Sequence, residues 1–132
     1  MTTAITQNAS EAVLVDSSGW LEYITADTKA QLFAPFLESQ SVIVVPTIVL
    51  YEVRKILLLR RGKTDADIFL SQVLRKKVVD LDERVAIAAA ALSVSHQLPK
   101  ADAIIYATSQ IESANLVTTD AHFSGLPGVT IL

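Results

Sequence analysis

Two aspartates each follow a short apolar run, at positions where a carboxylate can take part in chemistry. Asp16 follows the run "AVLV", and Asp120 ends the stretch "NLVTTD". A carboxylate placed in this way can accept N–H groups at the start of the next helix, or it can bind a cation or move a proton. Taken singly, each aspartate fits both interpretations.

Two further acidic residues lie in segments with helical periodicity. Glu52 shares a predicted helix face with apolar side chains three and four positions away. An ionised carboxylate on such a face needs a counterion or hydrogen-bond donors. A salt bridge to Arg54 or Lys55 would meet this need, and so would a metal ion. Asp102 begins a predicted helix after Pro99, where the helix dipole alone would favour an acid.

The elements that must position these acids alternate between short β-branched runs and longer helical patterns. We predict strands at 12–15, 41–45, 77–81, 115–119 and 128–132. We predict helices at 17–24, 28–39, 47–61, from Thr64 onward, 83–97 and 101–114, with Thr47 and Asp82 as caps and Gly62 as a helix end. This alternation predicts a three-layer α/β/α fold whose central five-stranded sheet is mostly parallel, with the third strand at its edge.

In this fold the four acids Asp16, Glu52, Asp102 and Asp120 are expected on one rim, because ligands of open α/β sheets bind beyond the carboxyl ends of the strands. Unpaired carboxylates on one rim would repel each other and raise each other's pKa. Mg²⁺ or Mn²⁺, which prefer oxygen ligands, would relieve this repulsion. Zinc is disfavoured, since the chain has no cysteine and its two histidines are far apart in the sequence.

Other polar residues are expected around the same rim. The hydroxyls of Ser17 and Thr118 could hold a water or a metal-bound carboxylate in place, although capping or strand packing would also explain them. Basic residues cluster in the segments 54–63 and 75–77, with Lys100 alone later in the chain. These clusters fit either a solvated helix face or a basic rim around an acidic centre.

Length and composition exclude several classes of protein. The chain has 132 residues, of which 51% are hydrophobic and 19% charged, which indicates one ordered domain at 12–132 after a short polar leader at 1–11. A net charge of −3 argues weakly against a dedicated nucleic-acid binder. No apolar run is long enough for a membrane span, and the lack of cysteine fits the reducing cytoplasm.

The order of these motifs resembles that of a known family. "LVDSSGW", the glutamate in "PTIVLYEVRK", "KADAIIYATS" and "LVTTDAHF" together look like the PIN-domain nucleases, and most like the VapC-type toxins of bacterial toxin–antitoxin pairs. The likeness covers about residues 12 to 132. It implies a Mg²⁺- or Mn²⁺-dependent ribonuclease with Asp16, Glu52, Asp102 and Asp120 as metal-binding catalytic residues.

The resemblance also implies partners. Such toxins usually form homodimers and are silenced by a small antitoxin, and the basic residues Arg54, Lys55 and Lys100 are candidates for contact with RNA or antitoxin. Many members carry an arginine shortly before the third acid, where this chain has Lys100. Lysine supplies charge but no planar bidentate fork, so a specific phosphate clamp is not expected there.

Two other interpretations compete with the nuclease. A phosphoacceptor receiver domain has a similar length and architecture, but it needs paired acids after the first strand and a lysine after the fifth, which this chain lacks. A non-catalytic PIN-like module would bind RNA or protein on the same fold without cutting. The presence of all four acids favours the nuclease.

Overall fold

The structure, a computed structural model, describes residues 12–132 and contains five strands in one sheet. The predicted leader at 1–11 lies outside the described residues. The strands are β1 (Ala12–Val15), β2 (Val42–Pro46), β3 (Lys77–Val79), β4 (Ala114–Thr118) and β5 (Val129–Ile131). Their order is β3-β2-β1-β4-β5 and all four pairings are parallel, which confirms the predicted sheet and its edge position for β3.

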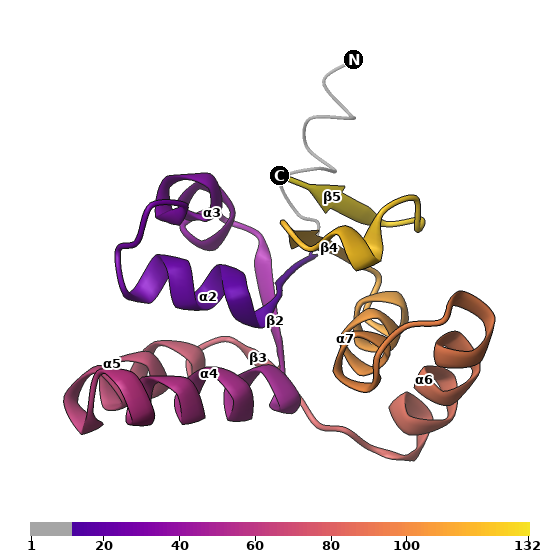
Figure 1. The fold of residues 1–132 in the computed structure, drawn as a ribbon, viewed down its shortest axis with the longest axis horizontal. Coiled ribbons are helices and arrows are strands. Elements are labelled where there is room, and N and C mark those ends of the chain that lie inside the picture. The colour runs from indigo at the N-terminus through magenta and orange to yellow at the C-terminus, as the bar shows by residue number, and fades with distance from the viewer. Residues whose placement is uncertain (1–11) are drawn as a thin grey trace.

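Six α-helices cover the two faces of the sheet (Figure 1). They are α2 (Ser17–Ile24), α3 (Ala30–Leu37), α4 (Thr47–Arg60), α5 (Lys63–Val73), α6 (Glu83–His96) and α7 (Lys100–Ile111), followed by a short 3₁₀ helix, η1 (Ala121–Phe123). Figure 1 shows α2 to α5 on one side of the sheet and α6 and α7 on the other. None of the helices in residues 12–132 is long and apolar enough to cross a membrane.

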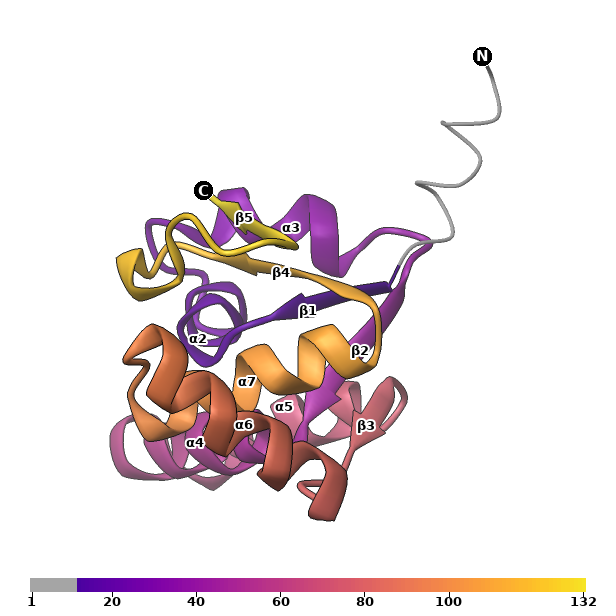
Figure 2. The ribbon, with the colours of Figure 1, turned by 90° about the vertical axis from the view of Figure 1, so that its right-hand side faces the viewer.

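The helices change faces because the direction of strand addition reverses between β1 and β4. The chain adds β2 and then β3 on one side of β1, returns through α6 and α7, and adds β4 and β5 on the other side. Figure 2 shows β1 in the middle of the sheet, between β2 and β4. Such a switch point leaves a crevice at the carboxyl ends of the two strands, which is the usual ligand site in this class of fold.

The apolar character of β1 and β2 follows from this central position. Val13, Leu14 and Val15 are buried, as are Ile43 to Pro46 in β2, because helices cover both faces. The core extends to α2, where Trp20 is 1% exposed. Its indole lies edge-on to the ring of Phe69 in α5, with 5.6 Å between ring centroids. Trp20 therefore packs in the core.

Several predicted boundaries differ from the observed ones. Thr47 does not cap α4: Pro46 occupies the N-cap, and the Thr47 hydroxyl instead accepts the N–H of Leu81 at 3.2 Å. The N–H of Leu81 is thus used outside the sheet, and β3 ends at Val79, two residues before the predicted strand does. The predicted cap Asp82 is confirmed, since its Oδ1 accepts the N–H of Val85 at 3.0 Å.

The other helix ends also shift by a few residues. Helix α5 begins at Lys63 and not at Thr64, α3 is shorter than predicted at both ends, and α7 ends at Ile111. Gly62 lies just beyond α4, as predicted. It has φ of +98°, and its N–H bonds the carbonyl of Leu57 at 2.8 Å. This positive φ is the reason a glycine suits the junction between α4 and α5.

Candidate functional site

Asp16 lies at the end of β1, at the switch point of the sheet, and is 5% exposed. It is the N-cap of α2: its Oδ1 accepts the N–H of Gly19 at 3.0 Å and the hydroxyl of Ser18 at 3.1 Å. The two alternatives for this carboxylate, helix cap and site residue, therefore do not exclude each other. Burial raises the pKa of Asp16 above its ordinary value, although hydrogen bonds from Thr118, Gly19 and Ser18 lower it.

Thr118 connects Asp16 to the neighbouring strand. Val15 lies opposite Val117 in the parallel register of β1 and β4, so the residues that follow them emerge side by side. The fully buried Thr118 hydroxyl donates to Asp16 Oδ2 and accepts the N–H of Asp120 at 2.9 Å. One hydroxyl therefore fixes the orientation of one acid and the backbone of the other.

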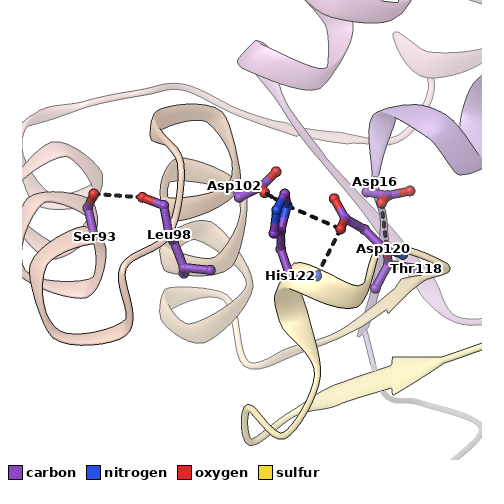
Figure 3. Close-up of polar contacts among 7 residues, drawn as sticks. All are labelled: Asp16, Ser93, Leu98, Asp102, Thr118, Asp120 and His122. Atoms are coloured by element: carbon purple, nitrogen blue, oxygen red, sulfur yellow. Dashed lines mark hydrogen bonds and ion pairs between the residues drawn. The ribbon is translucent and has the colours of Figure 1, made fainter.

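Asp102 and Asp120 come from different elements, and their side chains lie near each other on the two sides of His122 (Figure 3). Asp102 lies in the first turn of α7, whose N-cap is Pro99, and Asp120 precedes η1. Their side chains are 18% and 35% exposed. Burial raises the pKa of the Asp102 carboxyl, and the negative charge of Asp120 raises it further. The two carboxylates are thus close enough to repel each other.

His122 lies between these two acids. Its Nδ1 is 3.0 Å from Asp102 Oδ2 and 3.2 Å from Asp120 Oδ1 (Figure 3). Ligand atoms of Asp102, Asp120 and His122 all lie within 4.8 Å of one another, a spacing that one metal ion could bridge. The sequence shows only that His122 follows Asp120 by two residues. Its contact with Asp102 depends on how η1 packs against α7, and no local pattern in the sequence reports that.

Glu52 lies on α4 and is partly buried. It forms no salt bridge with Arg54 or Lys55; instead its Oε1 accepts the hydroxyl of Ser17 at 2.6 Å. Arg54 bonds the Ala66 carbonyl at 2.9 Å and Asp67 at 3.1 Å, and so joins α4 to α5. The guanidinium group of Arg54 is therefore engaged within the chain.

The other candidate basic residues are more accessible. Lys55 is exposed, and its ammonium group lies 5.8 Å from the centre of the Tyr51 ring. The same lysine lines a groove between α2 and α4 that also contains Ser17 and Glu52. Lys100 is exposed at the first position of α7, two residues before Asp102. Both lysines could therefore meet a ligand without breaking a salt bridge within residues 12–132.

Only two of the four predicted acids have ligand atoms close enough together to share one metal ion. Among the described residues, Asp102 and Asp120 form the close group with His122, while Asp16 and Glu52 lie outside it. Asp16 nevertheless lies near this group. The charge of Asp120 raises the pKa of Asp16, and the charge of Asp16 raises the pKa of Asp102. Carboxylates that destabilise each other's charged forms fit a divalent cation, which would remove the repulsion and take their oxygens as ligands.

Comparison with known proteins gives the context for this site. Among solved structures, a toxin–antitoxin complex from Klebsiella pneumoniae matches with a TM-score of 0.75 and 24% identity, over 89% of this chain and 95% of that one. The toxin VapC20 from Mycobacterium tuberculosis, described as cleaving the sarcin–ricin loop, matches with a TM-score of 0.73 and 19% identity, over 87% and 95% of the two chains.

VapBC2 from Rickettsia felis, bound to a DNA fragment from its promoter, matches with a TM-score of 0.71 and 16% identity, over 92% of this chain and 97% of that one. At these identities the likeness shows a shared fold. A comparison with curated proteins gave no match. The family model of the PIN domain matches residues 13–129, nearly all of the described structure, and the chain therefore belongs to the PIN domain family.

Proposed function

We propose that this protein is a divalent-metal-dependent endoribonuclease and the toxin of a toxin–antitoxin pair. The observation that carries the proposal is the meeting of Asp102 and Asp120 beside Asp16, at the switch point of a PIN-domain sheet. The structural likeness to toxin–antitoxin proteins supports the same function. Asp16, Glu52, Asp102 and Asp120 are the proposed metal-binding catalytic residues, with Ser17 and Thr118 orienting two of them.

The proposed reaction is the hydrolysis of an RNA phosphodiester bond. A bound Mg²⁺ or Mn²⁺ ion would supply the activation of water and the neutralisation of charge on the phosphate. Asp120 is our candidate for orienting the attacking water and accepting its proton. Its Oδ1 accepts the N–H of His122 at 2.9 Å, whereas no donor within residues 12–132 is hydrogen-bonded to its Oδ2. The free oxygen can therefore accept a proton without breaking the local structure.

The remaining site residues have positioning roles in this proposal. Both oxygens of Asp16 accept hydrogen bonds, so its carboxylate is held in one orientation before any ligand arrives. The Ser17 hydroxyl orients the carboxylate of Glu52 by donating to its Oε1. Lys55 and Lys100 would attract the RNA backbone, and their exposure would make this contribution dependent on salt concentration.

The test is cleavage of RNA by the purified chain, free of any partner, with Mn²⁺ or Mg²⁺ and with EDTA as a control. We expect cleavage that EDTA abolishes and that Asp120→Asn and Asp102→Asn each remove, while circular dichroism shows an intact fold. The matched control is Asp80→Asn, an exposed acid outside the site, which should cleave like wild type. Binding of RNA without cleavage under both metals would contradict the proposal and favour the non-catalytic module.

The surface of α4 supports an antitoxin as partner. Tyr51, Leu58 and Leu59 are 59%, 47% and 75% exposed, and Arg54 and Lys55 line the same apolar groove. A short segment with apolar and acidic side chains would bury these residues and pair with the lysine. The two partner genes would then be expected side by side, both proteins acting in the cytoplasm.

The antitoxin contact is tested by co-purification with the product of the neighbouring small gene. We expect Leu59→Asp to release the partner, because it places a charge in the apolar groove. The matched control is Leu74→Asp, at a similarly exposed leucine beyond α5. Equal capture by both variants would contradict the proposed surface.

We also propose that the chain forms a homodimer. Light scattering on the purified chain would test this, and a monomeric mass would contradict it.

A further inference from the structure

We propose that His122 contributes an imidazole nitrogen to the cation site of Asp102 and Asp120, so that the site selects Mn²⁺ over Mg²⁺. This inference rests on the proposed metal-dependent function and deepens it. An all-carboxylate site would accept either ion, whereas a nitrogen ligand changes the preference. The proposal follows from the position of the ring, the way it is held and the chemistry of its nitrogen.

The position of the ring matches that of a metal ligand. Nδ1 of His122 lies 3.0 Å from Asp102 Oδ2 and 3.2 Å from Asp120 Oδ1. In an octahedral site with bonds of about 2.1 Å, neighbouring ligand atoms are separated by the edge of the octahedron, about 3.0 Å. Nδ1 therefore has, from each of the two carboxylate oxygens, the spacing of ligands on adjacent corners of one coordination shell, and ligand atoms of all three residues lie within 4.8 Å of one another. In Figure 3 the imidazole ring lies between the two carboxylates.

The main chain holds the ring in this place. Asp120 Oδ1 accepts the N–H of His122 at 2.9 Å, which fixes the start of η1. The next residue, Phe123, is 1% exposed and anchors η1 in the core. The side chain of His122 nevertheless remains 61% exposed. The buried neighbour thus anchors the backbone of His122, while the exposed ring can carry a proton on Nε2 and donate it in a hydrogen bond to water.

The chemistry of the nitrogen decides the selectivity. A neutral imidazole with its proton on Nε2 offers the lone pair of Nδ1 to a cation. Mg²⁺ is a hard ion that binds oxygen ligands and keeps several waters. Mn²⁺ also binds carboxylates, and as a softer transition-metal ion it accepts a nitrogen ligand more readily than Mg²⁺ does. Two carboxylates and one imidazole therefore favour Mn²⁺.

Metal binding, measured without any RNA, tests this inference. The chelator-stripped chain is titrated with Mn²⁺ and with Mg²⁺ by calorimetry at a pH of about 8, where an ordinary imidazole is neutral. We expect His122→Ala to lower Mn²⁺ affinity about 10- to 100-fold, in the range seen when residues that support a metal site are removed. Mg²⁺ affinity should change far less. The matched control is His96→Ala, at the exposed end of α6, which should bind both ions like wild type.

A spectroscopic readout separates ligation from mere positioning of the acids. Pulsed electron paramagnetic resonance of bound Mn²⁺ should show coupling to a ¹⁴N nucleus in wild type and in His96→Ala, and none in His122→Ala. Absence of this coupling in wild type, or an equal loss of affinity for both ions in His122→Ala, would overturn the inference.

Asp120→Asn distinguishes this inference from the proposed function. If that variant loses Mn²⁺ binding and RNA cleavage while His122→Ala binds Mn²⁺ like wild type, only the inference fails. If Asp120→Asn binds Mn²⁺ as tightly as wild type, the metal site itself fails, and the proposed function fails with it.

Discussion

Replacing Thr118 with valine should destabilise the chain more than the loss of one ordinary hydrogen bond. The valine has nearly the same shape but removes the hydroxyl that bridges Asp16 and Asp120. A hydrogen bond to a charged group contributes about 1.5–3 kcal/mol, and a neutral one about 0.5–1.5 kcal/mol. Because Thr118 and Asp16 are buried, water does not readily replace the lost partner. We therefore expect a loss of about 2–4.5 kcal/mol in unfolding free energy.

The measurement is urea denaturation followed by circular dichroism in the absence of divalent ions. Thr108→Val is the matched control, since Thr108 is also buried but donates one neutral hydrogen bond, to the carbonyl of Ile104 at 2.8 Å. That variant should lose about 0.5–1.5 kcal/mol. If Thr118→Val costs no more than Thr108→Val, the bridging hydroxyl does not stabilise the site as argued.

The pH dependence of the same variant gives a second check. The Thr118 bond lowers the pKa of Asp16, against the larger effect of burial, so removing it should raise this pKa further. The extra cost of Thr118→Val should then be smallest at a pH below about 4, where the raised pKa keeps Asp16 mostly protonated in the folded chain, and should grow as pH rises. A cost that is independent of pH would refute the role assigned to the charged form of Asp16.

Three further outcomes follow from the packing and charges of the fold. Gly19→Ala should lower the unfolding free energy by about 1–3 kcal/mol, although alanine ordinarily favours a helix. The new Cβ would lie 2.5 Å from Val15 Cγ1 and 2.6 Å from the Phe33 ring. Equal urea midpoints for variant and wild type would contradict this. The folded pKa of Asp16 lies above its ordinary value of 3.8, so this carboxyl favours folding below that pH and opposes it as pH rises. Asp16→Asn should therefore become more stable relative to wild type as pH rises above about 4 in denaturation experiments with EDTA, and a difference that does not change with pH would contradict the sign. Arg54→Met should cost about 1 kcal/mol in stability, because it removes the hydrogen bonds that join α4 to α5. The thermal midpoint measures this loss, and Lys55→Met, at an exposed lysine, should leave the midpoint unchanged.

The sheet was largely predictable because its strands are short apolar runs with few alternatives. The runs that form β1 and β2 are buried on both faces, and that double burial is visible as nearly continuous valine, isoleucine and leucine. The cap of α4 was less predictable. Pro46 occupies the N-cap of α4, where threonine is ordinarily preferred, and Thr47 uses its hydroxyl in a contact with Leu81, far along the chain. Such a contact has no local signal.

The site followed the same division. Asp16, Asp102 and Asp120 could be proposed from the sequence because each stands at the end of a strand or the start of a helix, and the parallel sheet brings such ends together. The hydrogen bond from Ser17 to Glu52 and the insertion of His122 between two acids depend on how separate helices pack. Residue types and spacing alone do not determine the angles at which these helices pack.

The burial of Trp20 gives the chain an intrinsic fluorescent reporter. It is the single tryptophan of the sequence, it is 1% exposed, and within residues 12–132 its Nε1 has no hydrogen-bond partner. An indole in such dry surroundings should emit at short wavelength in the folded chain and shift to longer wavelength on unfolding. Since Trp20 lies one helical turn after Asp16 and against Phe69, its emission would follow the loss of α2 and its contact with α5 directly, without an added label.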